Sequence, residues 1–207
     1  MTVNSNKSPS SVRIIGGAWR SRRLQVLDTP GLRPTPDRVR ETLFNWLQFS
    51  LVGARCLDLF AGTGILALEA LSRGAAQATA LELDPRAAAL LRQQGQLLCA
   101  DNFAVNRLPF IEEPFIVEQC DAITWLERKT PAPPYDLVFL DPPYASRLQV
   151  PCCELLHRRG WLAPGARIYL EAAEPLNTLA LPSGWRLTRH KRAGEVYYGL
   201  CERGAQA

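Results

Sequence analysis

The stretch Leu57–Ala70, LDLFAGTGILALEA, places a glycine-rich turn between an apolar run and a helix-forming segment. Gly62 and Gly64 have no side chains, so a ligand can come close to the backbone of this turn. The amide groups at the start of the following helix would face that ligand. This order of strand, turn and helix is typical of the ligand-binding unit of an open α/β sheet.

Strand-like and helix-like segments alternate downstream of this turn. The expected helices lie at 65–74, from Pro85 onward, at 122–129 and within 147–162. The expected strands are nearly continuous apolar runs at 54–60, 77–83, 114–120, 135–140 and 166–172. Residues 185–202 predict a hairpin that turns near Ala193 and Gly194. The pattern predicts a doubly wound, Rossmann-like α/β sheet that is mostly parallel, with an antiparallel hairpin at its C-terminal end.

The N-terminal part of the chain differs from this pattern. Residues 1–11 are polar and predict a disordered tail, because they lack the apolar run of a signal peptide. Residues 12–26 predict two short strands around a Gly-Gly turn. A proline-rich loop follows, and Asp37 is the expected cap of a helix over 38–49. We therefore expect a tail over 1–11, a basic hairpin and helix over 12–50, and the main α/β domain over 51–207.

Composition narrows the class of protein. No apolar run approaches the roughly 20 residues that span a membrane. Six cysteines without a C-x-x-C pair predict buried thiols in a reducing cytoplasm, and only two histidines accompany them, so no metal site is expected. The net charge is +4, yet residues 1–40 hold eight Lys and Arg against two acids. Such clustering fits either a polyanionic partner or a solvated basic face.

Two acids near the glycine turn bear on the choice of cofactor. The run Gly62-x-Gly64-x-x-Ala67 also fits a dinucleotide fingerprint, which would mean NAD. Glu82 ends the second strand of the unit, where a carboxylate can accept both hydroxyl protons of a ribose. Asp58 would repel a pyrophosphate but suits a cation. These observations favour S-adenosylmethionine (SAM), which carries a sulfonium and an ammonium, over NAD and over a purely structural turn.

The stretch Tyr135–Ser146, YDLVFLDPPYAS, ends an apolar strand with an acid, two prolines and an aromatic ring. An Asp-Pro pair is by itself most often a capped turn. Behind the glycine turn it has a chemical interpretation: Asp141 and a backbone carbonyl, that of Pro142, accept the two N–H bonds of an exocyclic amine. Proline fixes the direction of the carbonyl, and Tyr144 offers a ring on which a flipped base can stack.

Several stretches together carry a family resemblance. The glycine loop DLFAGTG resembles motif I of class I SAM-dependent methyltransferases, and Asp-Pro-Pro-Tyr resembles the motif of amino-group methyltransferases. With RIIGGAWRSRRLQV, RPTPDRVRETLFNWL and DLVFLDPPY in this order, residues from Val12 to about Glu202 resemble the RsmD-type family, the bacterial 16S ribosomal RNA guanine-N2 methyltransferases.

The resemblance implies the fold of class I methyltransferases and SAM-dependent methylation of one guanine N2 in 16S rRNA, in the small subunit or its assembly intermediate. Its catalytic residues would be Asp141, Pro142, Pro143 and Tyr144. Its cofactor site would be lined by Thr35, Arg38, Asp58, Phe60, Gly62, Gly64, Glu82, Leu83, Asp121 and Ala122. Asp121 is equally explained as the cap of the helix that it precedes.

The basic hairpin supplies the expected contacts to RNA. The planar donors of arginine suit phosphate, so the candidates are Arg13, Arg20, Arg22 and Arg23. Trp19 could stack on a base or pack in the core. We expect a cytoplasmic monomer that binds no membrane and no metal. The alternatives are an adenine-N6 methyltransferase, a protein-glutamine methyltransferase, an NAD-dependent oxidoreductase and an RNA-binding assembly factor without activity.

Overall fold

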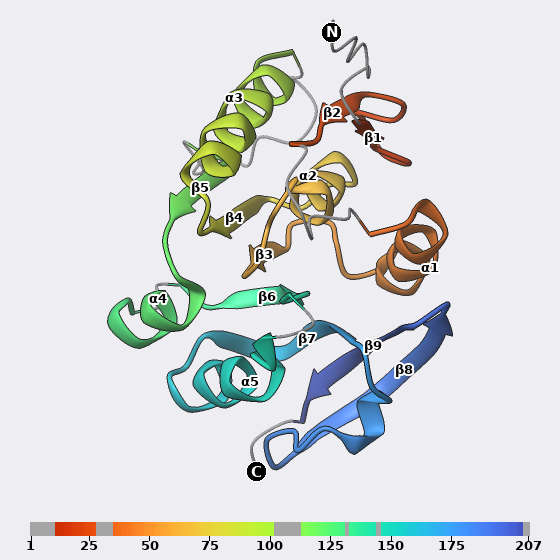
Figure 1. Cartoon of the computed structure of the whole chain (residues 1–207), viewed down its shortest axis with the longest axis vertical. Coiled ribbons are helices and arrows are strands. Elements are labelled where there is room, and N and C mark those ends of the chain that lie inside the picture. Colours follow the sequence, from red (N-terminus) through yellow and green to blue (C-terminus); the bar gives the residue numbers. More distant parts are fainter. Residues whose placement is uncertain (1–10, 28–34, 102–112, 131–132, 144–145, 205–207) are drawn as a thin grey trace, which may run out of the picture.

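A seven-stranded sheet forms the centre of the computed structural model, which describes residues 11–27, 35–101, 113–130, 133–143 and 146–204. Its strand order is β5-β4-β3-β6-β7-β9-β8 (Figure 1). The strands are β3 (Arg55–Asp58), β4 (Gln77–Glu82), β5 (Phe115–Gln119), β6 (Tyr135–Leu140), β7 (Leu162–Ala172), β8 (Trp185–Ala193) and β9 (Val196–Arg203). The first five are parallel, and β8 and β9 add the antiparallel hairpin. This confirms the predicted fold class.

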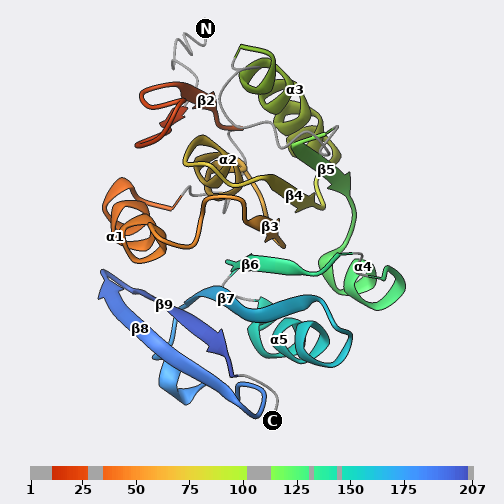
Figure 2. The ribbon, with the colours of Figure 1, turned by 180° about the vertical axis from the view of Figure 1, so that it is seen from behind.

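Helices cover both faces of the sheet (Figures 1 and 2). They are α1 (Asp37–Leu47), α2 (Ile65–Ser72), α3 (Pro85–Asp101), α4 (Ala122–Arg128) and α5 (Gln149–Arg158), with a 3₁₀ turn, η2 (Leu176–Thr178). One buried cluster contains the apolar side chains of α1, α2 and α3, and a second contains those of α4 and α5. None of the described helices is long and apolar enough to cross a membrane.

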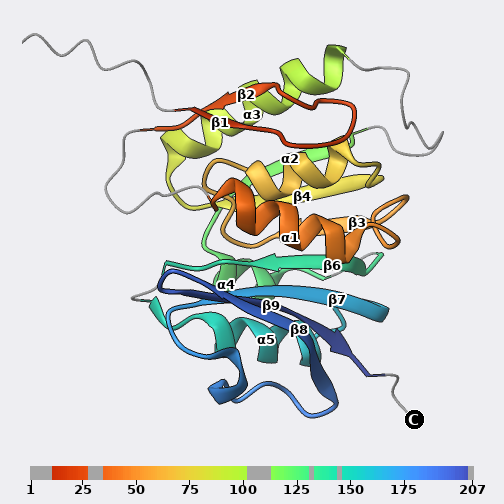
Figure 3. The same cartoon turned by 90° about the vertical axis from the view of Figure 1, so that its right-hand side faces the viewer.

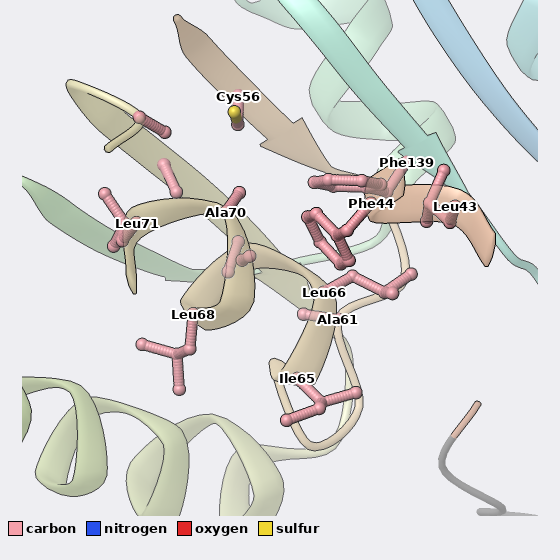
Figure 4. Close-up of a cluster of buried hydrophobic side chains, with 14 of the residues drawn as sticks. Leu43, Phe44, Cys56, Ala61, Ile65, Leu66, Leu68, Ala70, Leu71 and Phe139 are labelled. Atoms are coloured by element: carbon pink, nitrogen blue, oxygen red, sulfur yellow. The ribbon is translucent and has the colours of Figure 1, made fainter. Parts of the chain in front are cut away.

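The core explains why the sequence between the glycine turn and β4 is so apolar. Every residue of α2 is buried, because this helix lies between the sheet and the N-terminal elements. Phe44 of α1 meets Phe139 of β6 with ring centroids 6.2 Å apart, above Leu66 of α2 (Figure 4). Cys56 lies in the same cluster, and desolvation raises the pKa of its thiol far above the ordinary range. All six cysteines are free.

The N-terminal hairpin consists of β1 (Ser11–Arg13) and β2 (Arg23–Gln25), which pair antiparallel and lie over α2 and α3 (Figure 3). The segment that joins them is fastened to the end of α2: Ala18 N donates to Ser72 O at 2.7 Å and Trp19 N to Ser72 Oγ at 2.9 Å. Trp19 itself is 7% exposed, so it has the packing role. The arginine-rich turn therefore lies at the C-terminal end of α2.

The predicted cap of α1 is wrong. The N-cap is Pro36, which has no side-chain cap hydrogen bond, and Asp37 is the first residue of the helix. Its carboxylate instead accepts from Arg13 Nε at 2.8 Å and pairs with Arg40. An acid in the first turn still interacts favourably with the helix dipole, but its bonds to two arginines hold the helix to the hairpin.

Candidate active site

Four acids that the sequence singles out lie at one edge of the sheet. Asp58 ends β3 and Glu82 ends β4, while Asp121 follows β5 and Asp141 follows β6. These strands are parallel, so their carboxyl ends meet at the same edge. The chain order reverses between β3 and β6, and open α/β sheets bind their ligands at such a switch point.

The glycine turn connects β3 to α2 at this edge of the sheet. Gly64 is the N-cap of α2 with φ 70°, a left-handed conformation that favours glycine. A Cβ added there would come within 2.2 Å of Leu91 Cδ1 of α3, so the Leu91 side chain would have to move. Gly62, with φ 53°, donates its N–H to Glu82 Oε2 at 2.7 Å. The two consecutive strand ends are thus joined directly.

Glu82 and Asp121 have defined local roles. Glu82 Oε1 accepts from Asp84 N at 2.8 Å, which directs the carboxylate toward the glycine turn. Leu83, next to it, is 65% exposed, so it offers an apolar surface beside the acid. Asp121 caps α4 by accepting from Thr124 N at 2.8 Å, and Ala122 behind it is buried. The cap confirms one of the two interpretations of Asp121 and leaves the cofactor role a prediction.

Asp58 is the most deeply buried of the four acids, at 2% exposure. It accepts hydrogen bonds from the backbone of Phe60 and Ala67, and within the described part of the chain it forms no ion pair. Its pKa is raised to about 7, mainly by burial and in smaller part by the neighbouring charge of Glu82. A buried carboxylate with only backbone donors is a suitable site for a cationic group of a ligand.

Asp141 has a second acid beside it that the sequence did not single out. Leu140 pairs with Leu170 across β6 and β7, so Asp141 stands next to Glu171 at the carboxyl edge. Glu171 is 2% exposed, and its Oε1 accepts from the Tyr169 hydroxyl at 2.7 Å. The pKa of Asp141 lies well above its ordinary value, mainly through burial and then through the charges of Glu171 and Asp58.

One feature of the sequence could have identified Glu171 as a site residue. It lies in the predicted strand at 166–172, ARIYLEA, two residues beyond Tyr169 and close to the carboxyl end. An acid in an otherwise apolar, buried strand needs a partner or a function. Its position at the same edge as Asp141, however, becomes clear only from the register between β6 and β7.

Two further predicted cofactor residues, Thr35 and Arg38, lie near the start of α1, whereas Phe60 follows β3. Thr35 is buried, and its carbonyl accepts from Arg40 Nε at 3.1 Å. Arg40 in turn pairs with Glu69 of α2, so the start of α1 is held to the helix that begins at the glycine turn. Arg38 is exposed.

Of the other predicted catalytic residues, Pro142 is buried and Pro143 is exposed, while Tyr144 lies outside the described residues.

The predicted RNA contacts divide into two groups. Arg13 and Arg23 face each other across β1 and β2, and Arg13 reaches Asp37 at the start of α1. Arg20 and Arg22 are exposed on the turn that is fastened to Ser72. That turn lies at the opposite end of α2 from Gly64, roughly 12 Å away for eight residues at 1.5 Å each. The hairpin therefore does not bring all four arginines to the candidate site.

Comparisons with known proteins agree with this geometry. Residues 12–202 match the protein family described as conserved hypothetical protein 95. The chain is 44% identical to ribosomal RNA small subunit methyltransferase D of Escherichia coli K12, over 100% of this chain and 97% of that protein. It is 40% identical to the protein of the same name from Haemophilus influenzae, over 96% and 97% of the two chains.

Solved structures of methyltransferases are also similar to this chain. A putative methyltransferase of Escherichia coli, yhhF, superposes with a TM-score of 0.80 at 44% identity, over 95% of this chain and 100% of that chain. An RNA methyltransferase of Salinibacter ruber in complex with S-adenosylhomocysteine shares the fold, with a TM-score of 0.58 at 14% identity over 84% and 96%. The chain therefore belongs to the conserved hypothetical protein 95 family, the RsmD-type methyltransferases that its sequence resembles.

Proposed function

We propose that this protein transfers a methyl group from SAM to the exocyclic N2 amine of one guanine in 16S rRNA. The observation that carries the proposal is the position of Asp141, which follows β6 directly and lies beside Asp58 and the glycine turn. The full-length relatives named ribosomal RNA small subunit methyltransferase D support the choice of RNA. The fold alone would not distinguish one methyl acceptor from another.

The residues at this edge fit SAM. The left-handed backbone of Gly64 turns the chain tightly into α2, the buried carboxylate of Asp58 suits a cation, and Glu82 is placed to accept from a ribose. We propose that Phe60, Gly62, Leu83, Asp121 and Ala122 complete this site, with Leu83 against the adenine. When bound, SAM supplies an electrophilic methyl group on a positively charged sulfur.

The role of Asp141 follows from its surroundings. A guanine N2 is a poor nucleophile because its lone pair is delocalised into the ring. The Asp141 carboxylate would accept one N–H bond and the Pro142 carbonyl the other, which favours a pyramidal nitrogen. As the nitrogen gains the methyl group it must lose a proton. A carboxylate with a raised pKa, as in Asp141, is a competent acceptor for that proton.

We propose that residues 12–50 form a unit that covers the cofactor and contacts RNA. The start of α1 is joined to α2 through Arg40 and Glu69, so Thr35 and Arg38 are held next to the helix of the glycine turn. Arg13 and Arg23 are the hairpin arginines closest to this junction, since Arg13 bonds Asp37. The protein would act in the bacterial cytoplasm, as a monomer, on the small subunit or its assembly intermediate.

Methyl transfer with mapping of the product tests this proposal. Small subunits from cells that lack the enzyme are incubated with the protein and SAM carrying a tritiated methyl group, and the labelled nucleoside is identified. We expect label on N2 of one guanine of 16S rRNA. Label on N6 of an adenine would establish the alternative activity, and label on ribosomal protein would reject both.

A further inference from the structure

The edge strand β8 carries an unusual concentration of positive charge. Residues 186–192, RLTRHKR, contain four Lys and Arg and one His but no acid. Arg186, Arg189, His190, Lys191 and Arg192 are all exposed. Charged side chains also protect an edge strand from pairing with another chain. Either sign of charge would serve that purpose, so the uniform positive sign calls for a further explanation.

The register of the sheet places the basic end of this strand in the same row as Asp141, three strand spacings or about 14 Å from it. Lys191 pairs with Tyr198 of β9, and Tyr198 pairs with Glu171 of β7. Asp141 stands next to Glu171, because Leu140 pairs with Leu170. Lys191, Tyr198, Glu171 and Asp141 thus form one row across four strands. The β8–β9 turn extends beyond this row at the same edge of the sheet (Figure 3).

The charges at this end of β8 are available to a partner. Arg186, at the far end, reaches Glu202 at 4.0 Å, whereas no ion pair within the described residues involves Arg189, Lys191 or Arg192. Lys191 Nζ lies 5.9 Å from the ring centroid of Trp46, and that ring stacks on Tyr198. The Arg192 guanidinium lies over Tyr197 and donates to Gly194 O at 2.8 Å. Aromatic contacts orient two of these cations without neutralising them.

We infer that Arg189, Lys191 and Arg192, here called the β8 basic end, bind the phosphate backbone of the nucleotides that flank the target base in the substrate RNA. The inference rests on the proposed function for the identity of the polyanion. Arg189 and Lys191 lie on one face of this edge strand and Arg192 on the other, so together they can contact phosphates on both sides of the edge. Such contacts position a nucleic acid without reading its sequence. Arg20 and Arg22 lie instead on the turn that is bonded to Ser72, at the opposite end of α2 from Gly64.

A triple variant, R189Q/K191Q/R192Q, tests the inference through direct binding to a 16S rRNA transcript over a range of salt concentrations. Each lost phosphate contact lowers the slope of log K against log salt by about 1, so we expect a decrease of up to about 3. At physiological salt the affinity for RNA should fall roughly tenfold or more. Thermal stabilisation by SAM should not change, which would show that the variant is folded.

The matched control is R128Q/R158Q/R159Q, which removes the same charge. Helices α4 and α5 end at Arg128 and Arg158, at the opposite edge of the sheet. We expect this variant to retain the wild-type salt slope. An equal loss in both variants, or no loss in the first, would overturn the inference. A loss seen only with assembled subunits, with an unchanged slope on the transcript, would assign the β8 basic end to a ribosomal protein instead.

The two proposals fail in different ways. If the wild-type protein places no methyl group on rRNA, the proposed function is wrong, whatever the variants bind. If wild-type methylation proceeds and the triple variant binds and methylates with the wild-type KM for RNA, only the role of the β8 basic end is wrong. We expect the triple variant to have a raised KM for RNA and an unchanged kcat, because it leaves Asp141 and the SAM site intact.

Discussion

Asp58, Asp141 and Glu171 are three acids that a sheet core would ordinarily exclude. Asp58 and Glu171 are each 2% exposed, and burial dominates the raised pKa of Asp58 and of Asp141. Like charges this close disfavour one another's ionisation. The protein tolerates this cost at the edge where a cationic ligand and a proton donor are expected to bind, which is the pattern of a functional site.

The raised pKa of Asp58 predicts how SAM affinity depends on pH. Without ligand this pKa is about 7, and a bound cation would lower it, so binding favours the ionised carboxylate. The Kd for SAM should therefore rise as pH falls from about 7 to 5.5, by up to tenfold per pH unit. Isothermal titration calorimetry across this range measures the effect.

The matching variant is Asp58→Asn, which keeps the shape of the side chain and removes its titration. It should bind SAM more weakly at pH 7.5 and with little dependence on pH. A D58N protein that retained the wild-type pH dependence would show that another group controls it. The sequence predicted Asp58 and Asp141, because each directly ends an apolar run. The sequence did not identify Glu171, because its position next to Asp141 depends on the pairing of β6 with β7.

At the scale of elements, α1 is fastened to α2 by a buried ion cluster. Arg40 is fully buried and contacts Asp37, Glu69 Oε2 at 3.3 Å and the carbonyl of Thr35. Glu69 is also fully buried, and accepts from Ile15 N at 2.8 Å and from Arg73 Nε at 2.8 Å. The cluster therefore joins the hairpin, α1 and α2, which are the elements proposed to cover the cofactor.

Replacing Arg40 with Met should destabilise the protein by about 3 kcal/mol, because Glu69 would remain buried with only part of its compensation. Urea unfolding followed by tryptophan fluorescence measures the difference. The control is Arg158→Met, which breaks an exposed pair with Glu154 and should cost less than about 0.5 kcal/mol. Similar costs for the two variants would mean that the buried cluster does not hold these elements together.

The local sequence predicted the existence of α1 but not its connections. The spacing of Val39, Leu43, Trp46 and Leu47 predicts the apolar face of the helix. The structure buries Val39, Leu43 and Leu47 fully and Trp46 in part. Asp37 has a residue type that favours a helix cap, yet its carboxylate binds Arg13, 24 residues earlier, and Arg40, three residues later in the same helix. The carboxylate of Asp37 could accept either from backbone amides of the helix or from arginine side chains, and in this structure the arginines bind it.

At the scale of the whole molecule, the alternation of strands and helices was sufficient to predict the sheet. Parallel connections are restricted in handedness, so βαβ units leave few possible orders. The C-terminal hairpin was predicted as an antiparallel addition to the sheet, which the structure confirms, whereas the position of the N-terminal hairpin could not be predicted. The arginine-rich turn of the N-terminal hairpin lies at the far end of α2, and the C-terminal hairpin brings its basic end to the row of Asp141. The first position depends on hydrogen bonds between residues more than 50 apart in sequence, and the second on the pairing of β9 with β7.

The central claim is that Asp141 performs the chemistry at the carboxyl edge of this sheet. The most direct measurement compares single-turnover methyl transfer to small subunits by the wild type, Asp141→Ala and Asp136→Ala, with SAM binding measured for each. Asp136 lies on the same strand at its other end, where it is exposed and accepts from Arg55 N at 2.8 Å. We predict that D141A binds SAM but loses transfer by roughly 100-fold or more, whereas D136A retains the wild-type rate. Full transfer by D141A with SAM bound would contradict the account.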